Sequence, residues 1–62
     1  MTEEQMFKVF ADKTRREKLD YLIDMTHKDP QTISLQSCTM TEDEITSWCV
    51  ETAREFTNLV NS

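Results

Sequence analysis

T-E-D-E-I-T-S-W-C-V-E-T-A-R-E-F-T-N-L-V, residues 41–60, is the stretch that decides the fold. Its apolar side chains recur at steps of three and four, which places them on one face of an α-helix. Thr41 and Glu44 have the spacing of a capping box, in which each side chain accepts a hydrogen bond from the other residue's free backbone N–H. We therefore expect a helix that begins beside Thr41. Its apolar face would hold Ile45, Trp48, Cys49, Phe56, Leu59 and Val60, with Thr52 and Ala53 between them.

The first thirty residues predict two further helices, over residues 3–11 and 14–26. Thr2 and Gln5 form another capping box, and Asp12 or Thr14 can cap the second helix. A single helix that bends through residues 12–14 is the alternative. Pro30, just after His27 and Lys28, ends this block. The apolar positions are Met6, Phe7, Val9, Phe10 and Ala11 in the first helix and Leu19, Leu22 and Ile23 in the second.

Residues 31–40 are ambiguous. Ile33 and Leu35 alternate as in a strand, but a lone strand would have no partner in this chain. We expect a short helix over residues 32–38 or an irregular connection. Charged residues four apart predict ion pairs on the exposed helix faces. These pairs are Glu4–Lys8, Lys8–Asp12, Lys13–Glu17 and Arg16–Asp20.

Composition limits the fold to one small helical domain. The chain has 62 residues with no glycine and one proline, so tight turns that need a positive φ are disfavoured. We expect an all-α domain over residues 1–62 with three or four short helices. It would be a helix-turn-helix-like bundle with the last helix packed across the first two. Because so short a chain buries a thin core, we also expect a dimer formed through the last helix.

The charge is acidic and unevenly placed. The net charge is −5, of which residues 1–30 carry seven acids and six bases (−1) and residues 31–62 carry five acids and one base (−4). Phosphate backbones repel such a chain, so nucleic-acid binding is disfavoured. Because the first residues are acidic and polar, we expect no signal peptide. Because the sequence has no long apolar run, we expect no membrane-spanning helix. We expect a cytoplasmic protein with reduced cysteines and no contact with membranes.

No catalytic, metal or cofactor site is expected. His27, Cys38 and Cys49 are spaced eleven apart, unlike the close pairs of zinc sites. Cys49 falls on the apolar helix face, where a thiol acts as a small hydrophobe. The acidic run at residues 42–44 suits the start of a helix, because its charges complement the helix dipole.

Two groups of residues are candidates for partner contact. Trp48 is large for so small a core, and Val50 lies off the apolar face among polar residues, a pattern typical of a protein-contact hot spot. The alternative is that Trp48 fills the core. The predicted partner-binding residues are Trp48, Val50, Glu51, Arg54 and Glu55. The only basic cluster, around Lys13, Arg15, Arg16 and Lys18, could contact phosphate or an acidic partner, the alternative being an exposed face paired with Glu17 and Asp20.

The stretch F-K-V-F-A-D-K-T-R-R-E-K-L, residues 7–19, resembles the phrase that joins the first two helices of ArsR-type winged helix-turn-helix regulators. The resemblance implies that residues 32–38 and 42–56 correspond to the two helices of a helix-turn-helix. Asn58, Leu59 and Val60 would then precede the wing. The chain departs from the family pattern at Lys13, where proline is usual. It also departs in residues 42–56, the expected second helix of the helix-turn-helix, whose exposed positions are acidic. It also ends where the two-stranded wing would begin. The resemblance therefore implies the helical fold more than DNA binding.

These patterns together predict a small non-enzymatic regulatory protein that acts by binding another protein, such as a component of a transcription complex. The alternative is a minimal DNA-binding helix-turn-helix regulator. Only the second hypothesis requires the protein to bind DNA, and that binding should weaken as the salt concentration rises.

Overall fold

The computed structural model describes the backbone of residues 2–61 and the side chains of residues 2–57. It contains four helices: α1 (Glu3–Ala11), α2 (Arg15–Thr26), α3 (Pro30–Ser37) and α4 (Glu42–Asn61). The described chain contains no strand. The predicted all-α class is confirmed, as is the separation of the first two helices.

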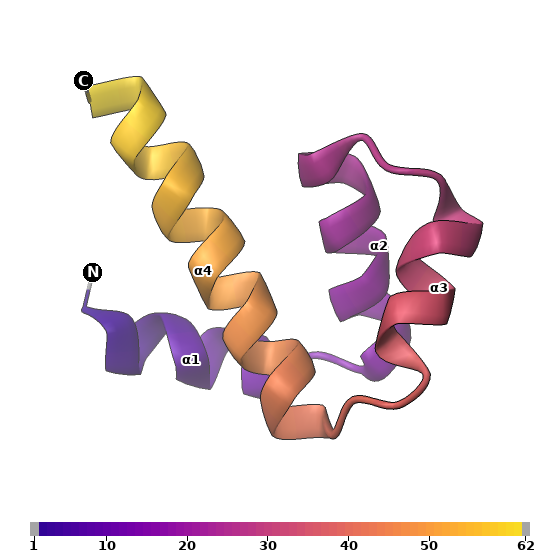
Figure 1. Ribbon diagram of the computed structural model, residues 1–62. Helices are drawn as coiled ribbons and strands as arrows, with labels where there is room; N and C mark the ends of the chain where they lie inside the picture. The colour runs from indigo at the N-terminus through magenta and orange to yellow at the C-terminus, as the bar shows by residue number, and fades with distance from the viewer. Residues whose placement is uncertain (1, 62) are drawn as a thin grey trace.

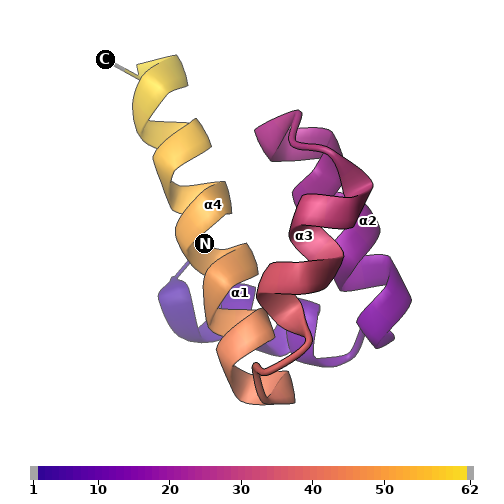
Figure 2. The ribbon, with the colours of Figure 1, turned by 45° about the vertical axis from the view of Figure 1, so that its right-hand side comes forward.

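Helix α4 makes the most extensive contacts with other helices. It lies against both α1 and α2, and α2 also lies against α3. Figure 1 shows α1 crossing the N-terminal half of α4, while α2 and α3 run antiparallel as a hairpin beside it. The C-terminal half of α4 extends past α1 in both views, and only its end lies beyond the α2–α3 hairpin (Figures 1 and 2). The predicted packing of the last helix across the first two is confirmed.

Local capping sets three of the helix starts. Thr2 with Gln5 and Thr14 with Glu17 both form complete capping boxes. Thr41 accepts from the Glu44 backbone N–H, and the Glu44 carboxylate accepts from the Thr41 backbone N–H, at 3.3 Å each. Helix α3 begins differently, with Pro30 in its first turn and no side-chain cap at Asp29. A proline fits there because the first helical N–H needs no partner within the helix.

The core lies where α4 meets α1 and α2 and where α2 meets α3, and it contains Phe10, Leu22, Ile33, Cys49 and Val50. The Phe10 and Tyr21 rings lie 4.8 Å apart, tilted by 53°. Burial raises the pKa of the Tyr21 phenol. The predicted core role of Cys49 is confirmed, because its side chain is buried as a free thiol.

Two predictions about α4 were wrong. Val50, expected among exposed polar residues, is only 8% exposed. Helix α1 covers a second side of α4 in addition to the side that faces α2, which widens the buried arc to include Val50. Phe56, expected on the buried face, is 53% exposed because it lies on the half of α4 that extends past α1. The side chains of Leu59 and Val60, and the phrase at residues 58–60, lie outside the described side chains.

The predicted pairing of charges was also wrong. None of the four expected four-apart pairs occurs among the ion pairs of residues 2–57. These instead join Arg15 to Glu42, Lys18 to Glu42 and Arg54 to Glu3. Each pair connects two helices. The ion pairs between α2 and α4 and between α1 and α4 involve none of the residues in the four predicted pairs.

Candidate protein-contact surface

Trp48 is half-buried on α4, with part of its ring against the core. Beside it lies a hollow of about 360 Å³ lined by Met40, Asp43, Glu44, Ser47, Trp48 and Glu51. Its apolar part is the thioether of Met40 and the indole of Trp48, and three of its lining residues are carboxylates. A half-exposed indole next to carboxylates suits a partner that carries both apolar and cationic groups.

A second hollow lies between α1 and α4. It has a volume of about 210 Å³ and is lined by Glu3, Phe7, Ser47, Val50, Glu51 and Arg54. Ser47 and Glu51 line both hollows, so the two form one continuous surface along α4. We call this the Trp48 surface and define it by the lining residues of the two hollows.

The structure brings four of the five predicted partner-binding residues together on this surface. Trp48, Val50, Glu51 and Arg54 line it. Glu55 is exposed one turn beyond Glu51 and lines neither hollow. Sequence reasoning missed Met40 and Phe7, which supply apolar atoms from outside α4. Met40 precedes the helix and Phe7 belongs to α1, so no periodicity within α4 points to either residue.

The Trp48 surface is electrostatically negative. Glu44 is held by its cap contacts with Thr41, and Arg54 is paired with Glu3. Asp43 and Glu51 have no ion-pair partner among the described side chains. Excess carboxylate around an indole attracts cations through the combined field of the charges and the ring face.

The other flank of Trp48 differs in charge. A further hollow of about 420 Å³ is lined by Lys28, Gln36, Met40 and Trp48. Trp48 and Met40 therefore form an apolar ridge with acids on one side and a lysine on the other. A partner can contact this ridge in one orientation better than in the reverse, because the charges on its two sides have opposite signs.

The predicted basic cluster does not form one open patch. The Arg15 guanidinium donates to Glu42 at 3.2 Å and to the Ser37 carbonyl at 2.8 Å. Lys18, expected in the exposed cluster, is only 2% exposed. Its ammonium donates to Glu42 Oε2 at 2.9 Å and to Thr46 Oγ1 at 3.1 Å. Arg15 and Lys18, two of the four bases of the cluster, are thus held by contacts with α4 and with the end of α3.

Glu42 accepts both of these cations at the start of α4. Hydrogen bonds from Lys18 and then from Arg15 lower the pKa of its carboxyl below the ordinary 4.5. The acidic run at residues 42–44 therefore includes a residue that connects helices, in addition to complementing the helix dipole. The remaining bases of the cluster are separated: Lys13 is exposed between α1 and α2, and Arg16 lines a groove between α2 and α3.

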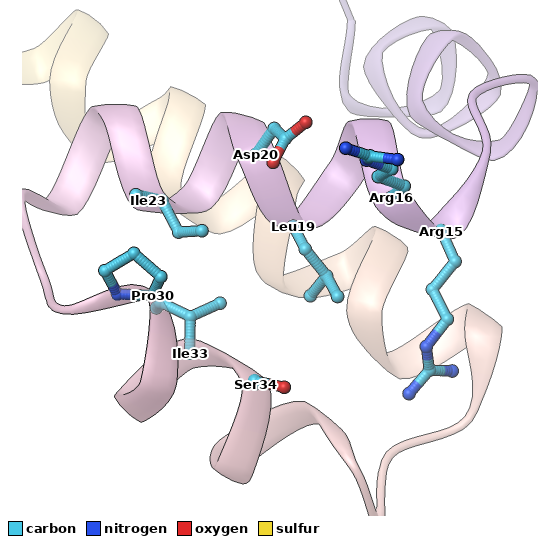
Figure 3. Close-up of a pocket in the computed structure, with 8 residues that line it drawn as sticks. All are labelled: Arg15, Arg16, Leu19, Asp20, Ile23, Pro30, Ile33 and Ser34. Atoms are coloured by element: carbon cyan, nitrogen blue, oxygen red, sulfur yellow. The ribbon is translucent and has the colours of Figure 1, made fainter.

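That groove has a volume of about 430 Å³ and lies along the α2–α3 hairpin. Figure 3 shows Leu19 and Ile23 of α2 facing Pro30 and Ile33 of α3 across it. Arg16 and Asp20 stand along its α2 edge in the same view. Its lining residues are Arg15, Arg16, Leu19, Asp20, Ile23, Pro30, Ile33 and Ser34.

The described side chains contain no group of three His, Cys, Asp or Glu residues placed to hold a metal ion. Burial raises the pKa of the Cys49 thiol to about 11, so it is a protonated thiol at neutral pH, and its Sγ lies 3.6 Å from the Lys18 carbonyl oxygen. Within the described residues, no helix combines the length and apolar character needed to cross a membrane.

Comparison with known proteins gives no significant match to a protein-family model, a curated protein or a solved structure. The resemblance of residues 7–19 to ArsR-type regulators therefore stays a prediction.

Proposed function

We propose that this chain is a small, cytoplasmic, non-enzymatic regulatory protein that acts by binding another protein through the Trp48 surface. The observation that carries the proposal is the half-buried indole of Trp48 in a hollow bordered by carboxylates. Aromatic side chains in such settings contribute a large share of the binding energy at protein interfaces.

The partner segment that fits this surface is basic and has an apolar anchor. Asp43, Glu44 and Glu51 supply negative charge, and Met40 and Trp48 supply apolar contact. A lysine or arginine over the indole would gain both the cation–π attraction and the field of the carboxylates. The net charge of −5 favours approach of such a partner from a distance.

The test compares capture of cellular proteins by the tagged wild type with capture by the Glu51→Lys/Glu55→Lys variant. The matched control, Asp24→Lys/Glu4→Lys, makes the same change in charge at exposed positions outside the Trp48 surface. We expect a basic partner to be captured by the wild type and the control and lost with the Glu51→Lys/Glu55→Lys variant. Capture of the same partner by all three proteins would contradict the proposed surface.

Trp48→Phe is a second test, because phenylalanine keeps part of the core contact while giving a weaker cation–π site. We expect it to remain folded and to bind the captured partner several-fold more weakly. Circular dichroism of the variant checks its folding. Unchanged affinity would contradict the role of the indole.

DNA binding is the second candidate, favoured by the arrangement of α3 and α4 as consecutive helices joined across residues 38–41. Against it, the start of α4 presents Asp43 and Glu44, where a recognition helix needs groups that reach phosphates and base edges. A gel shift at low salt with random duplex tests this function. Binding that fades as salt rises, and that weakens in Arg15→Ala or Arg16→Ala, would support it over protein binding.

A further inference from the structure

The α2–α3 groove is an apolar feature that the proposed function does not use. None of its lining residues belongs to the Trp48 surface. Leu19 and Ile23 are half-buried, and Pro30 is exposed beside them. Contact with another apolar surface would remove these side chains from water.

The charges on the edge of the groove indicate what such a surface must carry. Arg16 and Asp20 stand one turn apart on α2, and neither forms an ion pair among the described side chains. Arg15, the other base that lines the groove, is paired with Glu42. One base and one acid without an ion pair on the same helix face make that face complementary to itself. A two-fold axis that crosses α2 midway between them brings Arg16 of each copy opposite Asp20 of the other.

We propose that the α2–α3 groove is the dimer interface of this protein and that its occupant is a second copy of the chain. The two α2 helices lie antiparallel across the axis, with Leu19 beside it and Ile23 opposite the N-terminal end of the partner's α2. The two α2–α3 hairpins then stack face to face as a four-helix layer. The Trp48 surface of each copy stays free, since it shares no residue with the groove.

Other occupants fit the edge charges less well. A strongly acidic segment would meet Asp20, and a strongly basic segment would meet Arg16, so each leaves one like-charge contact. A dimer through α4 instead would place Asp43, Glu51 and Glu55 of one copy near the same acids of the other. The described acids of α4 thus oppose self-association there, while the α2 edge favours it.

The test measures the dimer dissociation constant by sedimentation equilibrium for the wild type and for Arg16→Asp and Asp20→Arg. Both residues are exposed, so these variants should fold, and circular dichroism checks that they do. Each substitution turns two attractive contacts per dimer into two repulsive ones. We expect each to weaken the dimer about tenfold or more.

Two further samples make the test specific for antiparallel α2 pairing. The double variant Arg16→Asp/Asp20→Arg restores both contacts and should dimerise like the wild type. An equal mixture of the two single variants should form a heterodimer, since one copy carries two acids at these positions and the other two bases. Lys8→Asp, the same charge change as Arg16→Asp on exposed α1, should leave the dimer unchanged.

Three results would overturn the proposal. The first is a wild-type monomer up to its solubility limit. The second is a dimer that the single variants leave intact, which would place the interface elsewhere. The third is a double variant as weak as the single variants. None of these bears on partner capture through Glu51, so this proposal and the proposed function can fail independently.

Discussion

The ammonium of Lys18 lies 2.9 Å from Glu42 Oε2, which joins the second turn of α2 to the first residue of α4 across 24 positions of sequence. The lysine is 2% exposed, whereas the Glu42 side chain is 56% exposed. The cation is therefore buried and the anion remains in contact with water. Thr46 provides a second acceptor for the ammonium and itself donates to the Glu42 carbonyl.

Lys18→Ala should lower the free energy of unfolding by about 2–4 kcal/mol, because it empties a buried site and leaves polar groups without partners. Lys18→Met keeps the stem of the side chain, and Glu42 retains Arg15 and water as partners. Replacing a buried charge with an apolar group of similar shape is often nearly neutral, so we expect a cost of about 1 kcal/mol or less. Urea unfolding followed by Trp48 fluorescence measures both values. An equal cost for the two variants would mean that the charge matters more than the packing.

Acid should destabilise the fold partly through Glu42. Its pKa is lowered from 4.5 in the folded state by Lys18 and Arg15, so its stabilising contribution is present above pH 4.5 and is lost as pH falls through the lowered pKa. Glu42→Gln should therefore be less stable than the wild type at neutral pH and approach it in acid. Urea unfolding as a function of pH measures this difference.

Some dependence on acid should remain in Glu42→Gln. Hydrogen bonds from the Thr14 backbone and hydroxyl lower the pKa of Glu17 as well, so its contribution is also lost in acid. The control is Glu4→Gln, at an exposed position with no side-chain hydrogen bond among the described residues. A constant difference between Glu42→Gln and the wild type at every pH would contradict the assignment to Glu42.

The helices were predictable because their signals are local. Two predicted capping boxes, each joining residues three apart, located the starts of α1 and α4 to within a residue or two, and Thr14, one of the two caps expected for α2, is the cap that forms. Helix α3 was ambiguous because its eight residues are too few for a clear apolar period. The proline in its first turn fits equally well as the end of the previous block, so it does not mark a new helix by itself.

The contacts between helices were not predictable from the same signals. Lys18 follows three charged residues, Arg15, Arg16 and Glu17, and only the position of α4 explains why it is buried. Val50 likewise depends on where α1 crosses α4. Four residues of the candidate site were found because they share α4, whereas Met40 and Phe7 come from other segments that the fold brings beside it.

His27 offers a direct test of backbone strain. It ends α2 with φ 56° and ψ 23°, and its N–H donates to the Ile23 carbonyl at 3.0 Å. Glycine usually occupies this position, because a Cβ is disfavoured in the left-handed region, but the chain has no glycine. His27→Gly should raise the free energy of unfolding by about 0.5–1 kcal/mol, measured by urea unfolding. Lys28→Gly is the control and should not stabilise, since His27 is the only described residue with a positive φ. An equal gain in both variants would exclude strain at His27 as the cause.

The two thiols should differ in reactivity. Cys38 is exposed, whereas Cys49 is buried with its pKa raised to about 11. Since the thiolate is the reactive form, a disulfide reagent at mildly alkaline pH should label one thiol per chain quickly and the second only in denaturant. Cys38→Ser should abolish the fast phase, and Cys49→Ser should leave it intact. Rapid labelling of Cys49 in the native protein would mean that α2 and α4 separate often, because its Sγ lies against the Lys18 carbonyl between these helices.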